Sequence, residues 1–193
     1  MKAKYKTWYY WREEWVKPVI YALVIALFIR AFIAQPFKIP TSSMFPTFKP
    51  GDRIFVNKFI YGVRIPFTDI RLPKLREPER GDIIVFRSPI EKKYLVKRLI
   101  GKPGDVVEIK NQKVWINGKP AEIPAIKSVI YYNRGEYGKA GRSVKVPPGC
   151  YYMLGDNSLN SVDSRYWGFA PAKNVAGKVF LIWWPLRRIR IVK

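Results

Sequence analysis

A run of hydroxyl-bearing residues between two prolines is the stretch whose residue types could support nucleophilic chemistry. Thr41, Ser42 and Ser43 lie between Pro40 and Pro46. Proline fixes φ and drives the preceding residue toward extended geometry, so this backbone is stiff and non-helical. A stiff backbone suits a nucleophile because it holds the hydroxyl in one direction. The alternative interpretation is a set of ordinary turn hydroxyls that bond local backbone groups.

Composition restricts the base that would activate a serine here. The chain contains no histidine, which excludes the Ser-His-Asp arrangement. A lysine can serve instead, but only if it is desolvated enough to lose its proton near neutral pH. The sequence should therefore place a lysine on a buried face.

Lys97 meets that requirement. It lies in the run 94–100, YLVKRLI, whose composition is typical of a strand. Because side chains alternate along a strand, Leu95, Lys97 and Leu99 share one face. Apolar neighbours disfavour the charged amine and lower its pKa, which is the condition for a general base. Arg98 satisfies the same description on the other face, and an ordinary edge-strand lysine is the alternative.

Composition indicates a folded chain without disulfide or zinc support. It has 193 residues, of which 48% are hydrophobic and 16% aromatic, enough for a core in one or two small domains. The one cysteine, Cys150, permits no intramolecular disulfide, and the lack of histidine effectively excludes a structural zinc site. We interpret Cys150 as a small core residue, with a nucleophilic thiol as the alternative.

The net charge indicates an anionic partner or surface. Lysine and arginine number 36 against 14 aspartate and glutamate residues, which gives +22. Nucleic acid and anionic lipid head groups both fit this charge. The densest basic cluster is residues 187–193, RRIRIVK, for which a solvated strand edge protected by charge is as good an interpretation as a lipid or nucleic-acid contact.

The first 34 residues have the composition of a membrane anchor. Residues 1–17 mix tryptophan and tyrosine with lysine and arginine, which suits a membrane interface. Residues 18–34 carry no charge except Arg30, near the lower length limit for a spanning helix, and Arg30 lies close enough to one end to snorkel. A buried core helix is one alternative. A cleaved secretory signal is disfavoured because the bulky Phe32 stands where a small residue is needed.

From residue 35 on, helical periodicity disappears and the pattern predicts an all-β domain. Asn117-Gly118 predicts a two-residue hairpin turn. Residues 61–80, with three prolines and many charges, are predicted to form an exposed loop or long hairpin. Short β-branched or aromatic runs between turn signals predict strands over 53–57, 82–87, 94–100, 106–110, 114–116, 151–154 and 178–184.

Four blocks behind the apolar segment resemble those of type I signal peptidases, the membrane-anchored Ser/Lys endopeptidases. No single block is decisive, whereas four in this order are highly specific and span most of the chain. The nucleophile block is QPFKIPTSSMFPT (35–47), the strand block GDIIVF (81–86), the lysine block YLVKRLIGKPGD (94–105) and the last block GDNSLNSVDSRYWG (155–168).

The resemblance implies the catalytic roles. Ser43, directly before Met44, stands in the nucleophile position, and Lys97 stands in the position of the general base. The backbone N–H of Ser43 and the hydroxyl of Thr41 would form the oxyanion hole, where family members carry serine or threonine.

Other matched residues imply support and substrate binding. Ser161 resembles the residue that orients the lysine amine, while Asp163 and Arg165 match a charged pair that supports the site. The substrate strand and a small apolar pocket that accepts alanine are implied at Phe37, Ile39, Pro40, Met44 and Val96.

The chain departs from the family pattern in two places. Ser42 stands where the family usually has glycine, a position at which single-anchor members vary. Ser158 and Leu159 replace a common arginine-aspartate pair, which removes charges near the support pair and leaves open how Arg165 is held. The interval of about residues 106–150 is short, which implies a reduced cap.

These features together imply a mainly β protein. A single N-terminal transmembrane helix would precede an all-β catalytic domain, of the kind shared by signal peptidases and self-cleaving repressors, with a small β cap. The expected parts are an interfacial segment and anchor at 1–34, a first core part at 35–105 with an exposed hairpin at about 58–80, a cap at 106–150 and a second core part at 151–193.

The resemblance implies a membrane-bound serine endopeptidase that removes signal peptides from exported preproteins. It would cut after a small residue, at Ala-X-Ala sites, with no metal or organic cofactor. Its partners would be preprotein signal peptides, anionic membrane lipids and the Sec or Tat translocation machinery, and not nucleic acid. It would cross the inner (plasma) membrane once, with the N-terminus in the cytoplasm and the catalytic domain outside.

Two other classes remain open. A self-cleaving repressor of the same catalytic fold would need a DNA-binding domain, and the aromatic, apolar segment stands in its place. A non-enzymatic, basic, membrane-anchored β module that binds anionic surfaces would make Ser43 and Lys97 incidental.

Overall fold

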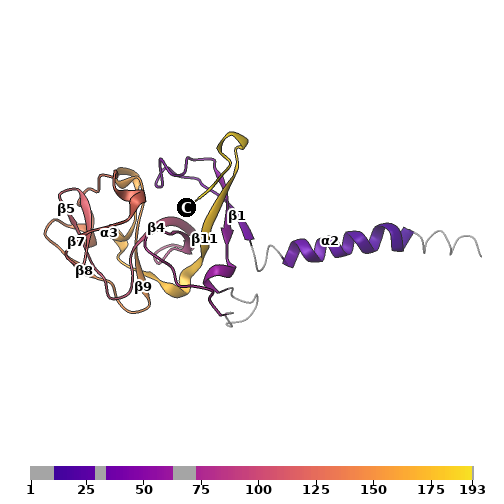
Figure 1. The fold of residues 1–193 in the computed structure, drawn as a ribbon, viewed down its shortest axis with the longest axis horizontal. Helices are drawn as coiled ribbons and strands as arrows, with labels where there is room; N and C mark the ends of the chain where they lie inside the picture. The colour runs from indigo at the N-terminus through magenta and orange to yellow at the C-terminus, as the bar shows by residue number, and fades with distance from the viewer. Residues whose placement is uncertain (1–10, 29–33, 63–72, 193) are drawn as a thin grey trace, which may run out of the picture.

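The computed structural model describes residues 11–28, 34–62 and 73–192. Two antiparallel sheets organise the part of the chain that follows the N-terminal helix (Figure 1). The mainly β fold predicted from the sequence is therefore confirmed.

The larger sheet has eight strands in the order β1-β2-β11-β3-β4-β9-β10, with β12 paired to β11. It brings the strand before Ser43 and the strand that carries Lys97 into one antiparallel sheet. Its strands are β1 Ala34–Lys38, β2 Arg53–Asn57, β3 Ile83–Arg87, β4 Tyr94–Gly101, β9 Cys150–Leu154, β10 Ala170–Pro171, β11 Val175–Trp184 and β12 Arg190–Ile191.

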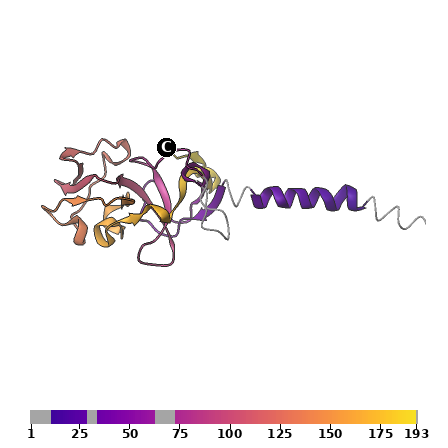
Figure 2. The same ribbon diagram turned by 90° about the horizontal axis from the view of Figure 1, so that it is seen from below.

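The smaller sheet has the order β7-β6-β5-β8 and lies on the side of the β domain away from β1, as the views in Figures 1 and 2 show. Asn117 and Gly118 join β6 to β7 with φ of 53° and 77°, which confirms the predicted two-residue hairpin. Its strands are β5 Val106–Lys110, β6 Lys113–Ile116, β7 Lys119–Pro120 and β8 Val144–Lys145.

Short helical turns punctuate the chain between the strands. Only α2 exceeds five residues among the described helices. They are η1 Arg12–Val16, α2 Lys17–Phe28, η3 Phe59–Tyr61, η4 Pro124–Ile126, η5 Glu136–Gly138, η6 Ser158–Asn160, α3 Ser164–Trp167, η7 Ala172–Asn174 and η8 Leu186–Arg188.

Most predicted strands match the structure. Strands β2 and β5 have the predicted bounds, whereas β11 begins three residues before the predicted 178. Strand β1 was not predicted, because its sequence contains Pro36 together with Gln35 and Lys38 and so lacks a strand pattern. It lies at the edge of the sheet, where proline is tolerated.

The predicted exposed segment at 58–80 is wrong at its start. Tyr61 ends η3 with its side chain buried, and its hydroxyl donates to the carboxylate of Asp82 at 2.6 Å. Asp82 also pairs with Arg76 and Lys178. Its hydrogen bond satisfies the Tyr61 hydroxyl, which allows this side chain to be buried. Residues 63–72 lie outside the described residues.

The basic C-terminal cluster forms the strand edge that its charge pattern indicates. Strand β12 pairs with β11, and the Arg188 guanidinium makes two hydrogen bonds of 2.9 Å to the buried carboxylate of Asp52. Arg190 donates to the carbonyl of Thr47 at 2.7 Å. The chain end thus braces the loop that follows Ser43.

The described N-terminal helix covers the first part of the predicted anchor. Helix α2 follows η1, spans twelve residues, and extends away from the sheets with its apolar side chains exposed (Figure 1). Within the described ranges, no helix combines the length and hydropathy that crossing a membrane requires. Residues 29–33, which belong to the predicted run 18–34, lie outside the described residues.

Buried apolar side chains form three clusters between and beside the sheets. One lines the smaller sheet, and Cys150 packs half-buried against it, as predicted for a core residue. The second includes Met44 and receives Val96, and the third includes Leu99. The residues around Ser43 and Lys97 are therefore anchored in the core of the larger sheet.

Candidate active site

Ser43 and Lys97 come from elements far apart in the sequence. Ser43 lies in the loop between β1 and β2, whereas Lys97 lies in β4, where antiparallel pairing sets it opposite Ile84 of β3. The Lys97 Nζ lies 2.7 Å from the Ser43 Oγ. This is the hydrogen-bond distance that a nucleophile and its base require.

The Lys97 amine is adapted to act as a base. Its side chain is only 3% exposed, and this desolvation lowers its pKa from 10.5 to about 8. The charge of Asp163 opposes the shift, and that of Arg165 reinforces it. A substantial fraction of the amine is therefore neutral near physiological pH, as a general base must be.

Asn157 and Gly155, which follow β9, hold the serine loop. The backbone N–H of Asn157 donates to the Ser43 carbonyl at 3.0 Å, and its side-chain amide donates to the Ser42 carbonyl at 3.1 Å. A Cβ at Gly155 would lie 2.5 Å from the Ser43 carbonyl oxygen, so only glycine fits there. The last block quoted from the sequence contained both residues, but sequence reasoning gave neither a role.

A buried ion pair joins the three segments of the site. The Arg98 guanidinium donates to both carboxylate oxygens of Asp156, at 2.8 and 2.6 Å, and to the Gly81 carbonyl at 2.7 Å. The Thr47 hydroxyl donates to the same carboxylate at 2.5 Å. Arg98 is therefore committed to Asp156 and is not an alternative base, while its partner carboxylate also holds the loop after Ser43.

The predicted support pair is fully buried and bidentate. Arg165 donates to the two carboxylate oxygens of Asp163 at 2.8 and 2.9 Å, and Asp163 also accepts the backbone N–H of Gly155 at 3.0 Å. The Arg165 Nη1 donates to the Ser158 hydroxyl at 2.6 Å, and Nη2, which also bonds Asp163, donates to the Ser158 carbonyl at 2.8 Å. Arg165 is therefore held in part by Ser158, one of the residues that depart from the family pattern.

Ser161 lies beside the catalytic pair but does not bond it. It is buried, and its Oγ has no hydrogen-bond partner among the described residues. A Cβ at Gly155 would lie 2.2 Å from this oxygen, which places the Ser161 hydroxyl against the segment that holds Ser43.

The Thr41 hydroxyl lies at the solvent side of the nucleophile. It donates to the Ser43 Oγ at 3.4 Å, a long hydrogen bond that leaves it free to turn toward another acceptor. Its neighbourhood carries no clustered ligands, since no group of three or more acidic or cysteine side chains in the described part of the chain could hold a metal ion.

A groove of about 300 Å³ runs up to the catalytic pair between β1 and β4. Ser43, Thr41 and Lys97 lie in its wall, together with Tyr94 and Leu95. All the residues predicted to bind substrate line it as well, namely Phe37, Ile39, Pro40, Met44 and Val96.

Breaking the support pair should cost stability. We expect Arg165→Leu to lower the free energy of unfolding by about 3–5 kcal/mol, because it leaves the Asp163 carboxylate buried without its counter-ion. Denaturant titration measures this. Arg142→Leu is the matched control, since its partner Glu136 is exposed, and it should leave the free energy of unfolding nearly unchanged. Similar small losses in both variants would contradict a structural role for the buried pair.

Comparison with known proteins gives consistent matches over most of the chain. Signal peptidase I of Pseudomonas aeruginosa is 35% identical over 89% of this chain and 73% of its own length. Signal peptidase I of Bacillus amyloliquefaciens is 38% identical over 99% of this chain and 94% of its own. A crystal structure of a signal peptidase I from Enterococcus faecalis, 36% identical, covers 53% of this chain and 97% of its own, with a TM-score of 0.45.

The family profile described as "Signal peptidase, peptidase S26" matches residues 12–184. The match begins in η1, includes the loop of Ser43, the strand of Lys97 and the Asp163–Arg165 pair, and ends with β11. With a profile over this length and relatives above 30% identity, the chain belongs to the signal peptidase family, peptidase S26.

Proposed function

We propose that this protein is a serine endopeptidase that removes N-terminal signal peptides from exported preproteins, with Ser43 as nucleophile and Lys97 as general base. The observation that carries the proposal is the 2.7 Å contact between the buried Lys97 amine and the Ser43 hydroxyl at the end of a groove. Family membership supplies the substrate class.

The reaction proceeds by acyl transfer. The neutral Lys97 amine takes the hydroxyl proton as the Ser43 Oγ forms a bond to the scissile carbonyl carbon. The tetrahedral intermediate then breaks its C–N bond, and the Lys97 ammonium gives its proton to the leaving amine. The acyl-enzyme is hydrolysed when Lys97 takes a proton from water, and the Ser43 Oγ is released with that proton.

The developing oxyanion would accept two hydrogen bonds. The backbone N–H of Ser43 is one donor, and the Thr41 hydroxyl, now 3.4 Å from the Ser43 Oγ, is the other after a rotation of its side chain. As the resemblance implies, Ser161, whose hydroxyl lies against Gly155, would orient the lysine amine, and the Asp163 carboxylate accepts the backbone N–H of Gly155.

The groove would bind the signal peptide as an extended strand. Strands β1 and β4 border it, and an extended peptide between them can bond both backbones. The apolar side chains of Ile39, Met44 and Val96 next to Ser43 leave room for a small residue, which fits cleavage after Ala-X-Ala.

The same proposal includes the membrane setting. Residues 18–34 would anchor the chain in the inner membrane with the β domain outside, where preproteins emerge from the Sec or Tat machinery. The net charge of +22 would hold the domain near anionic lipid. The parts expected from the sequence, with a first core part at 35–105, a cap at 106–150 and a second core part at 151–193, remain our proposal for its domain organisation.

This function is tested by incubating the full chain, in detergent, with a preprotein that carries an Ala-X-Ala site. We expect a cut directly after the second alanine, located by mass spectrometry of both products. Replacement of that alanine by a bulky leucine should abolish the cut, because the pocket beside Ser43 is small. Folded protein that cleaves neither substrate would favour the basic membrane-binding module.

A further inference from the structure

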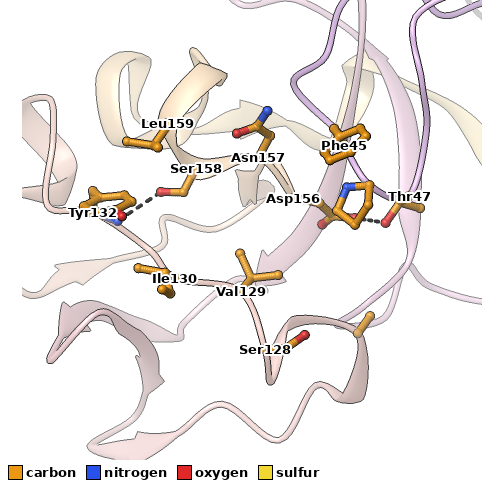
Figure 3. A pocket seen from close by; sticks show the side chains of 12 residues that line it. Phe45, Thr47, Ser128, Val129, Ile130, Tyr132, Asp156, Asn157, Ser158 and Leu159 are labelled. Atoms are coloured by element: carbon orange, nitrogen blue, oxygen red, sulfur yellow. Dashed lines mark hydrogen bonds between the residues drawn. The ribbon is translucent and has the colours of Figure 1, made fainter.

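A second cavity lies beside the catalytic loop, outside the groove described above. It has a volume of about 360 Å³ and lies between the residues that follow Ser43 and the segment 125–132 that crosses from the smaller sheet (Figure 3). It is lined by Phe45, Pro46, Thr47, Ala125, Ser128, Val129, Ile130, Tyr132, Asp156, Asn157, Ser158 and Leu159.

This cavity continues the groove past the nucleophile. Two segments of the chain line both: in the serine loop, Thr41, Ser43 and Met44 line the groove and residues 45–47 line the cavity. Likewise the groove takes Asn160 and Val162, whereas the cavity takes 156–159. A chain that lies in the groove and passes Ser43 therefore meets the cavity next.

The walls of the cavity are fixed by hydrogen bonds. The backbone N–H of Tyr132 donates to the Ser158 hydroxyl at 3.0 Å (Figure 3). The backbone N–H of the adjacent Tyr131 donates to the Gln112 carbonyl at 2.9 Å. On the opposite wall the Thr47 hydroxyl donates to Asp156. The space is therefore preformed, which lowers the entropic cost of binding.

Six of the twelve lining residues are apolar, and the others are polar but, apart from one, uncharged. In a chain of charge +22, no lysine or arginine is among its lining residues. Its one charged residue, Asp156, has a buried side chain paired with Arg98. Phe45, Ile130 and Leu159, exposed by 46%, 51% and 50%, supply open apolar surface around the rim.

We propose that this cavity is a subsite for an apolar side chain of the substrate on the leaving-group side, within the first three residues after the scissile bond. The inference rests on the proposed function, because it assumes a peptide bound in the groove with its scissile carbonyl at Ser43. The cavity would be a second determinant of specificity, which selects substrates by the first residues of the mature protein.

Substrates that differ only after the cleavage site test the inference. In each of the first three positions after an Ala-X-Ala site, leucine, lysine and aspartate are compared by kcat/KM. Wild type should prefer leucine to aspartate by about tenfold in kcat/KM at one of these positions, because an apolar pocket binds an apolar side chain more tightly than a charged one. Ile130→Asp and Leu159→Asp should each abolish that preference and favour lysine, while a change in KM carries most of the effect.

Ile90→Asp is the matched control, because Ile90 is 59% exposed and lines neither the groove nor the cavity. It should keep the wild-type preference. A flat wild-type profile at all three positions, or equal losses on every substrate in Ile130→Asp and Leu159→Asp, would overturn the subsite while leaving the peptidase intact. Failure to cleave any substrate would instead overturn the proposed function.

Discussion

Replacement of Ser43 by alanine is expected to lower kcat/KM for an Ala-X-Ala preprotein by about 10⁴-fold or more, because loss of a nucleophile removes the covalent route entirely. The Ser43 Oγ accepts a hydrogen bond from the Lys97 amine at 2.7 Å and a longer one from the Thr41 hydroxyl at 3.4 Å. Single-turnover cleavage, followed by mass spectrometry, measures the loss. The same variant should unfold at the wild-type temperature, since it removes one half-buried hydroxyl.

Ser42→Ala provides the matched control for that experiment. Ser42 is also half-buried and adjacent in sequence, but its contact with the rest of the site is through its carbonyl, which accepts from Asn157. It should retain activity within about threefold of wild type, as expected for a substitution that removes no essential contact. If Ser42→Ala were inactive and Ser43→Ala active, the nucleophile would be Ser42, and if both were active, no serine mechanism in this loop would stand.

The sequence predicts the strands whose pattern is local. β2 and β5 are each rich in β-branched or aromatic residues over a full strand length, and they form with the predicted bounds. β8, β10 and β12 span two residues each, and such strands exist only because a partner strand is beside them. No local pattern of two residues can show that, so these strands were not predicted.

The same distinction between local and long-range signals applies to the residues of the site. The absence of histidine and the strand-like apolar run made Lys97 a candidate base, but only the resemblance to type I signal peptidases assigned Lys97 that role and picked Ser43 as the nucleophile. The contacts of Asn157 with the Ser42 and Ser43 carbonyls could not be predicted, since backbone carbonyls have no sequence signature and the partners lie more than a hundred residues apart. The tie between Arg98 and Asp156 depends on the β4–β9 pairing in the same manner.

The buried lysine itself should be a source of instability. Its pKa in the folded protein, about 8, lies below the ordinary value of 10.5, so the folded state binds the proton more weakly than the unfolded chain does. Below pH 8 the charged amine is retained in the fold at a cost of about 3 kcal/mol, from 1.36 kcal/mol for each pKa unit. As pH rises from 8 to 10.5 the folded protein sheds the proton first, and this cost disappears.

Lys97→Met should therefore abolish catalysis and stabilise the fold. We expect kcat/KM to fall by about 10⁴-fold. We also expect the free energy of unfolding at pH 7 to rise by about 1–3 kcal/mol, because methionine fills the same apolar space without a charge. The gain should shrink as pH approaches 10.5.

Wild-type kcat/KM should rise about tenfold per pH unit below pH 8 and level off above it, since only the neutral amine accepts the Ser43 proton.

Lys145→Met is the control for both readouts, because Lys145 is exposed on β8 and lines neither the groove nor the cavity. It should show the wild-type pH profile and no pH-dependent gain in stability. If Lys97→Met were inactive but no more stable than wild type at any pH, the amine would be held by partners that offset its desolvation, and the flat stability would contradict a lowered pKa. If it were active, proton transfer in this enzyme would not depend on Lys97 at all. Inactivity together with a stability gain that is full below pH 8 and shrinks toward pH 10.5 is the joint result expected of a buried base with a lowered pKa, because removal of a purely structural lysine would instead destabilise the protein.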